Sequence, residues 1–202
     1  MEILLATTNL HKLREYKDMF KPFKHIELIS LHAFGDYQMP EETGITCKEN
    51  AILKAEHAAK ALNQLVLADD SGLFVPALKG LPGVHSRRFA GPDATDSENR
   101  QKLLTMMAKL SGDARIAYCE CALALASPDG LLKCTEGICE GFIAEKERGR
   151  NGFGYDPLFI KNDYDKTFAE MADSIKNRIS HRRKAFERFI SFFETQLSQC
   201  TI

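Results

Sequence analysis

An apolar run that ends in two adjacent carboxylates is the feature that most constrains how this chain can fold. Leu65-Val66-Leu67 predicts a buried strand, and Ala68-Asp69-Asp70-Ser71-Gly72 follows it directly. Side chains alternate between the two faces of a strand, so we expect Asp69 and Asp70 to point in opposite directions. One of them can then face a cleft and hold a hard metal ion, while the other anchors a turn. The alternative is a plain Asp-Ser-Gly turn after a buried strand.

Composition limits the class of protein. The 202 residues are enough for one sizeable core, or for one domain with two lobes. With 44% hydrophobic and 27% charged residues, the chain is typical of a soluble globular protein. The formal net charge of −1 gives no indication of a surface that binds polyanions over the whole molecule, so we expect no nucleic-acid partner.

The cysteines and the first residues indicate a reduced compartment. None of the six cysteines forms a Cys-x-x-Cys pair, and Cys119 and Cys121 alternate in a predicted strand as small buried hydrophobes do. The start lacks the basic and long apolar segments of a signal peptide. No run approaches the ~20 apolar residues that span a membrane. We therefore expect a cytoplasmic protein with free thiols and no membrane partner.

Apolar periodicity predicts alternating strands and helices. Strands are expected at residues 3–6, 65–69, 115–127 and 131–144, and helices at residues 10–20, 46–62, 95–110 and from about 180. Thr46 and Thr95 each open a capping-box pattern, and either Thr8 or Asn9 is a natural N-cap for the first helix. A turn at 128–130 joins the last two strands as a hairpin. This mixture predicts an α/β fold around a mixed sheet.

The strand-to-helix junction Thr7-Thr8-Asn9-Leu10-His11-Lys12 is a candidate phosphate site. The first N–H groups of a helix attract anions, phosphate above all. Lys12 in the first turn opposes the helix dipole, and a bound polyphosphate would turn this cost into a gain. The alternative is an ordinary capped helix with a solvated lysine, because the full P-loop pattern is absent.

Acidic residues just before the second predicted helix form a candidate metal site with Asp70. Glu41-Glu42-Thr43-Gly44 is the segment concerned. Carboxylates beside a glycine turn are usually solvated, and Glu49 can simply be the capping-box partner of Thr46. Oxygen ligands from separate segments are nevertheless what Mg²⁺ prefers, since it keeps waters and substrate phosphates as its other ligands. Glu42 with Asp70 would make such a sparse site.

Two later segments carry groups suited to a ligand. Residues 152–157, Gly-Phe-Gly-Tyr-Asp-Pro, combine glycines that let backbone approach a ligand with aromatic stacking faces and a carboxylate. A turn before a strand is the alternative there. The basic run 176–184 is most often a solvated helix start. Because its cations fall near a predicted helix N-terminus, an anionic or carbonyl-bearing ligand is favoured.

Together these segments resemble the inosine/xanthosine triphosphate pyrophosphatase family over nearly the whole chain. The resemblance rests on ordered motifs: Thr7-x-Asn9-x-x-Lys12, Glu42-Thr-Gly-x-Thr46, Glu49-Asn-Ala-x-x-Lys54-Ala, Ala68-Asp-Asp-Ser-Gly72, Pro82-Gly-Val-x-Ser86-x-Arg88, Gly152-Phe-Gly-Tyr-Asp-Pro157 and Ser180-His-Arg182. Each motif is weak alone, and their shared order is not expected by chance. The chain departs from the family at Thr8, where glycine is frequent, at Cys47, where phenylalanine is common, and at Ser174-Ile175, where acidic residues often stand.

The resemblance implies an elongated mixed β-sheet flanked by helices, in two lobes with an active-site cleft between them. It also implies a single pyrophosphatase domain over residues 1–202, and usually a homodimer. Carried over by position, the implied phosphate-binding residues are Thr7, Thr8, Asn9, Leu10, His11, Lys12 and Ser71. The implied Mg²⁺ ligands are Glu42 and Asp70, with Asp70 also the general base. The residues implied around the base and its sugar-phosphate are Phe153, Gly154, Tyr155, Asp156, Lys176, His181 and Arg182.

The implied reaction is the hydrolysis of ITP, dITP or XTP to the monophosphate and pyrophosphate, dependent on Mg²⁺. Donors from His181, Arg182 or backbone N–H groups would favour a 6-keto base. Adenine would leave these donors without an acceptor, at a free-energy cost of roughly 1–3 kcal/mol for each donor. Two alternatives stay open. One is a nucleotide-binding sensor without turnover, and the other is a pyrophosphatase for modified pyrimidine or methylated nucleotides.

Overall fold

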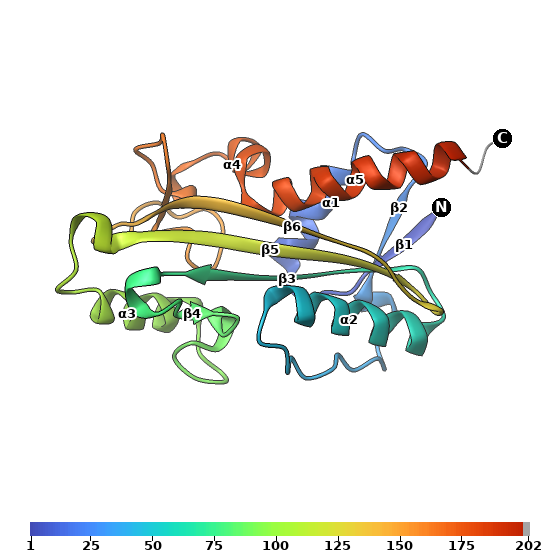
Figure 1. The fold of residues 1–202 in the computed structure, drawn as a ribbon, viewed down its shortest axis with the longest axis horizontal. Helices are drawn as coiled ribbons and strands as arrows, with labels where there is room; N and C mark the ends of the chain where they lie inside the picture. Colours follow the sequence, from blue (N-terminus) through green and yellow to red (C-terminus); the bar gives the residue numbers. More distant parts are fainter. Residues whose placement is uncertain (200–202) are drawn as a thin grey trace. The chain divides into compact units, whose positions relative to one another are not determined.

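The computed structural model describes residues 1–199, with side chains up to Phe193, so Cys200 lies outside the described residues. Its helices (Figure 1) are α1 (Leu10–Phe20), α2 (Cys47–Leu62), α3 (Asp96–Met106), α4 (Asp173–Ile179) and α5 (His181–Gln199). Its strands are β1 (Glu2–Leu5), β2 (Glu27–Ser30), β3 (Val66–Phe74), β4 (Pro82–Gly83), β5 (Ile116–Ser127), β6 (Gly130–Ile143) and β7 (Phe159–Lys161).

The strands form one mixed sheet. Its order is β2-β1-β3-β5-β6-β7, with β4 paired to β3 off this path. β1 runs parallel to both β2 and β3, with Leu4 opposite Val66, whereas β6 runs antiparallel to β7, with Phe142 opposite Ile160. The α/β class and the long β5–β6 hairpin that the sequence predicts are confirmed.

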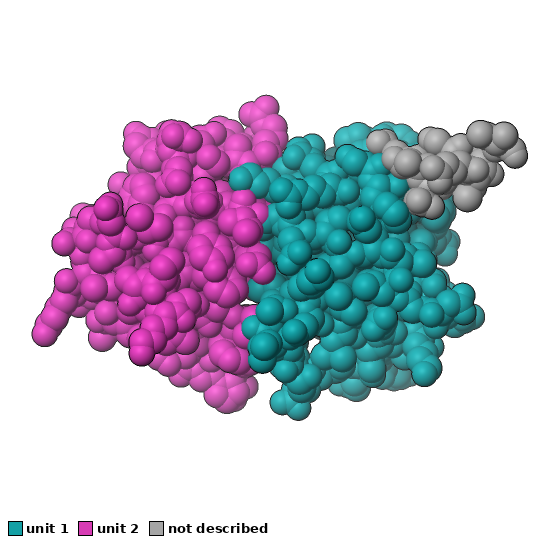
Figure 2. All heavy atoms as spheres, in the orientation of Figure 1, with its two compact units in different colours: residues 1–70, 121–137, 182–202 teal, residues 71–120, 138–181 magenta. Residues whose placement is uncertain are grey.

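The chain divides into two compact units, coloured separately in Figure 2. Unit 1 comprises residues 1–70, 121–137 and the chain from 182 onward; unit 2 comprises residues 71–120 and 138–181. The boundaries fall inside β3, β5 and β6, so each of these strands contributes residues to both units. The boundary in β3 separates Asp70 from Ser71.

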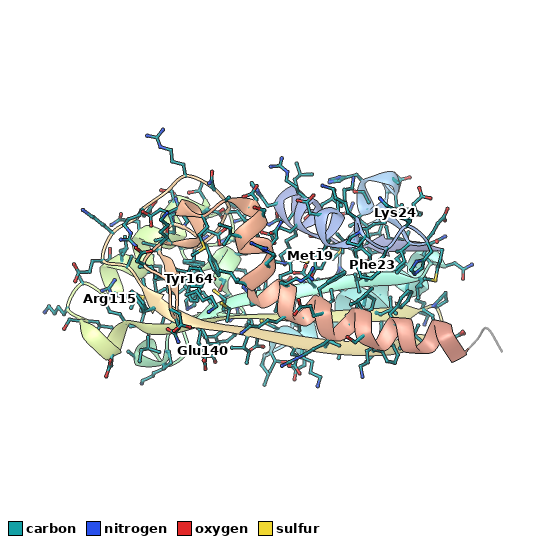
Figure 3. All side chains as sticks on the ribbon, turned by 90° about the horizontal axis from the view of Figure 1, so that it is seen from above. Met19, Phe23, Lys24, Arg115, Glu140 and Tyr164 are labelled. Atoms are coloured by element: carbon teal, nitrogen blue, oxygen red, sulfur yellow. The ribbon has the colours of Figure 1, made fainter. Side chains whose placement is uncertain are left out.

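Unit 1 is built on the alternation of its strand residues. Its main core packs α1 and α5 against one face of the strands, where Ile3, Leu5 and Leu67 are buried. Met19 and Phe23, labelled in Figure 3, belong to this contact: Met19 is buried within it and Phe23 packs against it. Residues of opposite parity in β3, such as Ala68, face the other way, and Figure 1 shows α2 on that side.

Unit 2 has a core of its own. It is formed by apolar residues of β3, α3, β5, β6, β7 and the loops between them, among them Leu73, Leu103 and Phe159. Arg115, labelled in Figure 3, is buried beside it and donates to four carbonyl oxygens, those of Met107, Leu110, Ile143 and Ala144, at 2.7–3.1 Å. A buried guanidinium is tolerated here because each of these bonds replaces one to water.

Three local predictions are corrected. β3 does not end at Asp69 but continues to Phe74, because Leu73 and Phe74 pair with β4. Glycine at position 72 permits this pairing, since a Cβ there would collide with the Gly83 carbonyl oxygen of β4. The α3 helix ends at Met106, earlier than expected. The helix α4, which the sequence does not predict, ends at Ile179, so Lys176 lies in its last turn, where the dipole favours a cation.

Capping signals decide where the helices begin. The side chain of Asn9, not Thr8, caps α1 by accepting from the N–H groups of His11 and Lys12. The capping box of α3 is complete. That of α2 is half formed: Thr46 Oγ1 accepts from Glu49 N–H, but Glu49 accepts from Ile45 N–H instead of from Thr46.

The free thiols predicted from the cysteine spacing are confirmed for the five cysteines that the structure describes. Cys121 is fully buried, and burial together with nearby Asp69 raises the pKa of its thiol to about 12, so the thiol is neutral. Within residues 1–199, none of the helices combines the length and apolar character that a membrane span requires.

Candidate active site

Asp70 and Glu42 share one lysine in unit 1. Lys54, on the buried side of α2, donates from Nζ to Asp70 Oδ1 (2.7 Å) and to Glu42 Oε1 (2.8 Å). Asp70 has the parity of Val66 and Ala68, so strand alternation aims it at α2. This contact brings together the two carboxylates that the sequence assigns to a metal.

The shared lysine leaves Asp70 only partly compensated. Burial opposes the charge of Lys54, but Asp70 and Glu42 outweigh it and raise the pKa of the lysine. Burial, reinforced by the like charge of Glu42, raises the pKa of Asp70 despite Lys54 and Lys12 nearby. The lysine therefore stays charged, while Asp70 is a carboxylate with an increased affinity for a proton.

The donor set suits a hard divalent cation at a sparse site. Glu42 and Asp70 present carboxylate oxygens, and Asp70 Oδ2 is buried without a hydrogen-bond partner. In the part of the chain that the structure describes, no three His, Cys, Asp or Glu side chains cluster as a metal site. The residues present thus fit an ion that keeps waters and substrate phosphates among its ligands, as Mg²⁺ does.

Asp69 points to the opposite face and lies in a buried ion-pair network. Its Oδ1 is 3.0 Å from Lys12 Nζ on α1, and its Oδ2 is 3.2 Å from Arg182 Nε on α5. Arg182 Nη1 lies 2.6 Å from Glu15 Oε2. The network joins two helices to β3 on the face that carries the main core of unit 1.

Charge neutralisation sets the ionisation of this network. Burial favours the neutral carboxyl of Asp69, but Lys12 and Arg182 outweigh it and hold its pKa well below the ordinary value. Burial also opposes the charge of Arg182, and Glu15 and Asp69 reverse this and raise its pKa. The pKa of Asp69 is therefore lowered, in contrast to that of its neighbour Asp70.

The predicted phosphate segment is present at the start of α1. Asn9 N–H donates to Thr7 Oγ1 (3.2 Å), and Asn9 Oδ1 accepts from the N–H groups of His11 (2.9 Å) and Lys12 (3.2 Å). Leu10 is 64% exposed although it is apolar. Residues Thr7 to Lys12 thus form an ordered helix start, in which the cation of Lys12 is held by Asp69.

A second cluster in unit 2 gathers residues of the predicted base-binding segments. Asp156 Oδ2 accepts from Phe153 N–H (2.8 Å) and from Lys176 Nζ (2.6 Å). Lys176 Nζ also lies 4.7 Å from the centroid of the Phe153 ring, a cation–π contact. Asp156 and Lys176 are both buried, so this pair fixes the loop to α4.

Glycines shape this loop. Gly152 has φ +76° and Gly154 has φ +59°, both in the left-handed region that glycine adopts without a Cβ penalty. A Cβ at Gly152 would collide with the Asp156 carboxylate. The loop is closed by side-chain bonds to its backbone, and Tyr155 Oη donates to the Ser86 carbonyl oxygen (3.0 Å).

The other predicted residues are divided between the units. Arg182 belongs to unit 1, whereas Ser71 and His181 belong to unit 2. His181, the first residue of α5, is buried, and Ser71 is half-buried. The roles assigned to all of these residues stay predictions.

A sequence model of the Ham1 family matches residues 3–192 of this chain. The chain belongs to the Ham1 family. A dITP/XTP pyrophosphatase of Protochlamydia amoebophila (strain UWE25) is 66% identical over 195 residues, which are 96% of this chain and 98% of that protein. One of Bacillus cereus is 47% identical over 189 residues, which are 93% of this chain and 92% of that protein.

Structural comparison agrees with this assignment. The structure of the Staphylococcus aureus Ham1 protein superposes with a TM-score of 0.85 at 41% identity, covering 97% of this chain and 100% of that one. The family that the sequence motifs predict is therefore confirmed, together with its α/β fold.

The chain also holds polar residues to which the sequence assigns no role. Glu15 is one of them. Its position beside Tyr16 and four residues before Met19 could have indicated that it lies on the buried side of α1. Lys54 is part of a sequence motif, but the motif does not indicate which residues it binds. Asp96 and Arg100 of α3 contact Gly154, more than 50 residues away, and no local pattern announces that contact.

Proposed function

We propose that this chain is a Mg²⁺-dependent nucleoside triphosphate pyrophosphohydrolase. It converts the non-standard purine nucleotides ITP, dITP and XTP to their monophosphates and pyrophosphate, and so removes them from the nucleotide pool. Membership of the Ham1 family and two relatives named dITP/XTP pyrophosphatase support this reaction. The structural observation that carries it is Asp70: a buried carboxylate with a raised pKa, one oxygen on Lys54 and the other without a partner.

Asp70 is the general base of the proposed mechanism. Its Oδ1 is held by Lys54, so Oδ2 accepts the proton of the water that attacks the α-phosphorus. A carboxylate whose pKa is raised towards the working pH is a better proton acceptor than an ordinary one. Glu42 and Asp70 would hold Mg²⁺, which supplies charge neutralisation at the phosphate oxygens.

Lys12 and the start of α1 are proposed to bind the phosphates. Asp69 fixes Lys12 Nζ at 3.0 Å, and its own depressed pKa keeps this pair ionised. A cation oriented in this way contributes to phosphate binding without first losing side-chain freedom. The proposed phosphate-binding residues are Thr7, Thr8, Asn9, Leu10, His11, Lys12 and Ser71.

The unit 2 loop is proposed to bind the base. Phe153 offers a ring for stacking, and its orientation is supported by Lys176 and Asp156. Donors from His181 or Arg182 would pair with the 6-keto oxygen of hypoxanthine or xanthine, and the 6-amino group of adenine would leave them unmet. The proposed base-binding residues are Phe153, Gly154, Tyr155, Asp156, Lys176, His181 and Arg182.

A panel of nucleotides tests this function. ITP, dITP, XTP, ATP and GTP are incubated with the protein and Mg²⁺, and pyrophosphate and orthophosphate are measured separately. We expect pyrophosphate from the first three only, and no product with EDTA. Orthophosphate as the main product, or nucleotide binding without turnover, would contradict the proposal and would favour a phosphatase or a sensor.

The proposal includes a single domain over residues 1–202, a homodimer and a cytoplasmic location. Each of these follows from the family resemblance or from the sequence composition. Light scattering on the purified chain measures the oligomeric state, and a mass equal to one chain would remove the homodimer from the proposal.

A further inference from the structure

Helix α3 holds both peptide groups that flank the Cα of Gly154. Asp96 Oδ2 accepts from Gly154 N–H (2.7 Å), and Arg100 Nη1 donates to the Gly154 carbonyl oxygen (2.9 Å). The two side chains are four residues apart and therefore lie on the same side of the helix. Arg100 Nε is also 3.0 Å from Glu147 Oε1, an ion pair in which Nε makes no hydrogen bond.

These contacts act at one of the two glycines of the loop. Gly154 has φ +59°, and a glycine has more backbone conformations to choose from than any other residue. Its neighbours are tied as well, because Phe153 N–H donates to Asp156 Oδ2 and Tyr155 Oη donates to the Ser86 carbonyl oxygen. The bonds from α3 complete a set that fixes three successive residues.

We propose that Asp96 and Arg100 are positioning residues that hold Phe153, Gly154 and Tyr155 in the conformation that selects the base. This inference rests on the proposed function, in which that segment binds the nucleobase. Neither side chain needs to touch the substrate. By removing alternative loop conformations before binding, they lower the entropic cost of forming the base pocket.

Asp96→Ala tests the inference. We expect KM for dITP to rise about tenfold with kcat changed less than about twofold, because a loop that binds the base acts equally in the ground and transition states. The ratio of kcat/KM for dITP over dATP is expected to fall. Asp96→Asn keeps an acceptor oxygen and should restore most of the affinity. Arg100→Met removes the other bond and should raise KM in the same direction.

Glu98→Ala is the matched control. Glu98 lies in the same first turn of α3, and its capping bonds join it to Thr95, the residue directly before the helix. The Glu98→Ala substitution therefore weakens the start of α3 while leaving the bonds to Gly154 in place. Unchanged KM and selectivity in Asp96→Ala, or an equal change in Glu98→Ala, would overturn the positioning role.

Amide exchange in the substrate-free protein separates this inference from the proposed function. Exchange at Gly154 N–H should be at least about tenfold faster in Asp96→Ala than in wild type or Glu98→Ala, because the variant lacks the acceptor. Equal rates would overturn the inference even if dITP is hydrolysed. Faster exchange in a protein that releases no pyrophosphate would support the positioning of the loop and contradict the function.

Discussion

The two adjacent aspartates of β3 in unit 1 are held by cations, whereas two aspartates of unit 2 hold the backbone N–H groups of one loop. Asp69 and Asp70 are each paired to a lysine, and Asp69 also to Arg182. In unit 2, Asp156 accepts from Phe153 N–H and Asp96 accepts from Gly154 N–H, although Asp156 also pairs with Lys176. The first arrangement fixes charged groups relative to one another, and the second fixes the path of the chain.

The difference has a physical consequence for what each region can do. Buried ions interact strongly with one another, so removing one member leaves another charge uncompensated. Side-chain bonds to a loop backbone mainly limit the number of loop conformations. We therefore expect changes in unit 1 to act on chemistry and global stability, and changes in the unit 2 loop to act on ligand selection.

The largest effect is expected at Asp70. Asp70→Asn keeps the shape of the side chain but removes the proton acceptor, and general-base catalysis contributes roughly 10²–10⁴-fold. Pyrophosphate release from dITP should fall by this factor while circular dichroism stays unchanged. Full activity in the variant would remove Asp70 from the mechanism.

Arg182→Ala is expected to affect stability first. The Arg182 side chain is 1% exposed and neutralises both Glu15 and Asp69. Its removal leaves two buried carboxylates short of a partner, at a cost of about 3–5 kcal/mol in the free energy of unfolding. Urea unfolding measures this cost, and it must be known before any loss of base selectivity in the variant is attributed to substrate contact.

Arg183→Ala is the matched control, because Arg183 forms an i,i+4 pair with the exposed side chain of Glu187. Such pairs contribute about 0.3–0.5 kcal/mol. Equal destabilisation by the two substitutions would contradict the buried network.

The pH dependence of stability should single out Asp69. The pKa of Asp69 is lower in the folded than in the unfolded protein. Its contribution to the free energy of unfolding is therefore fully present above the unfolded pKa, about 3.9, and is lost as the pH falls further. The stability difference between wild type and Asp69→Asn should therefore shrink below about pH 4. A difference that is constant from pH 7 to pH 3 would show that the carboxylate is not stabilised by Lys12 and Arg182.

Gly152→Ala should produce a smaller loss of stability than Arg182→Ala. The new Cβ would collide with the Asp156 carboxylate, and the residue would have to keep a φ of +76°. A cost of about 1–2 kcal/mol is expected, borne mainly by the loop. KM for dITP should rise more than kcat falls, and a pure loss of kcat would contradict the proposed division between the two regions.

Local signals predicted many elements of this fold because they involve neighbouring residues. The capping box from Thr95 to Glu98 and the turn at 128–130 both depend on residues a few positions apart. The prediction failed at β3, where Asp69 to Gly72 has the composition of a turn. The strand continues because β4 pairs with Leu73 and Phe74, a contact that the local sequence does not contain.

The sequence by itself determined that Asp69 and Asp70 face opposite ways, because alternation is a property of any strand. It also determined the family, through motifs that are ordered along the chain. Only the tertiary structure decided what each carboxylate meets: Lys54 on one face, and Lys12 with Arg182 on the other. Partners that are far apart in sequence are brought together by packing, and their charges give two adjacent aspartates pKa values shifted in opposite directions.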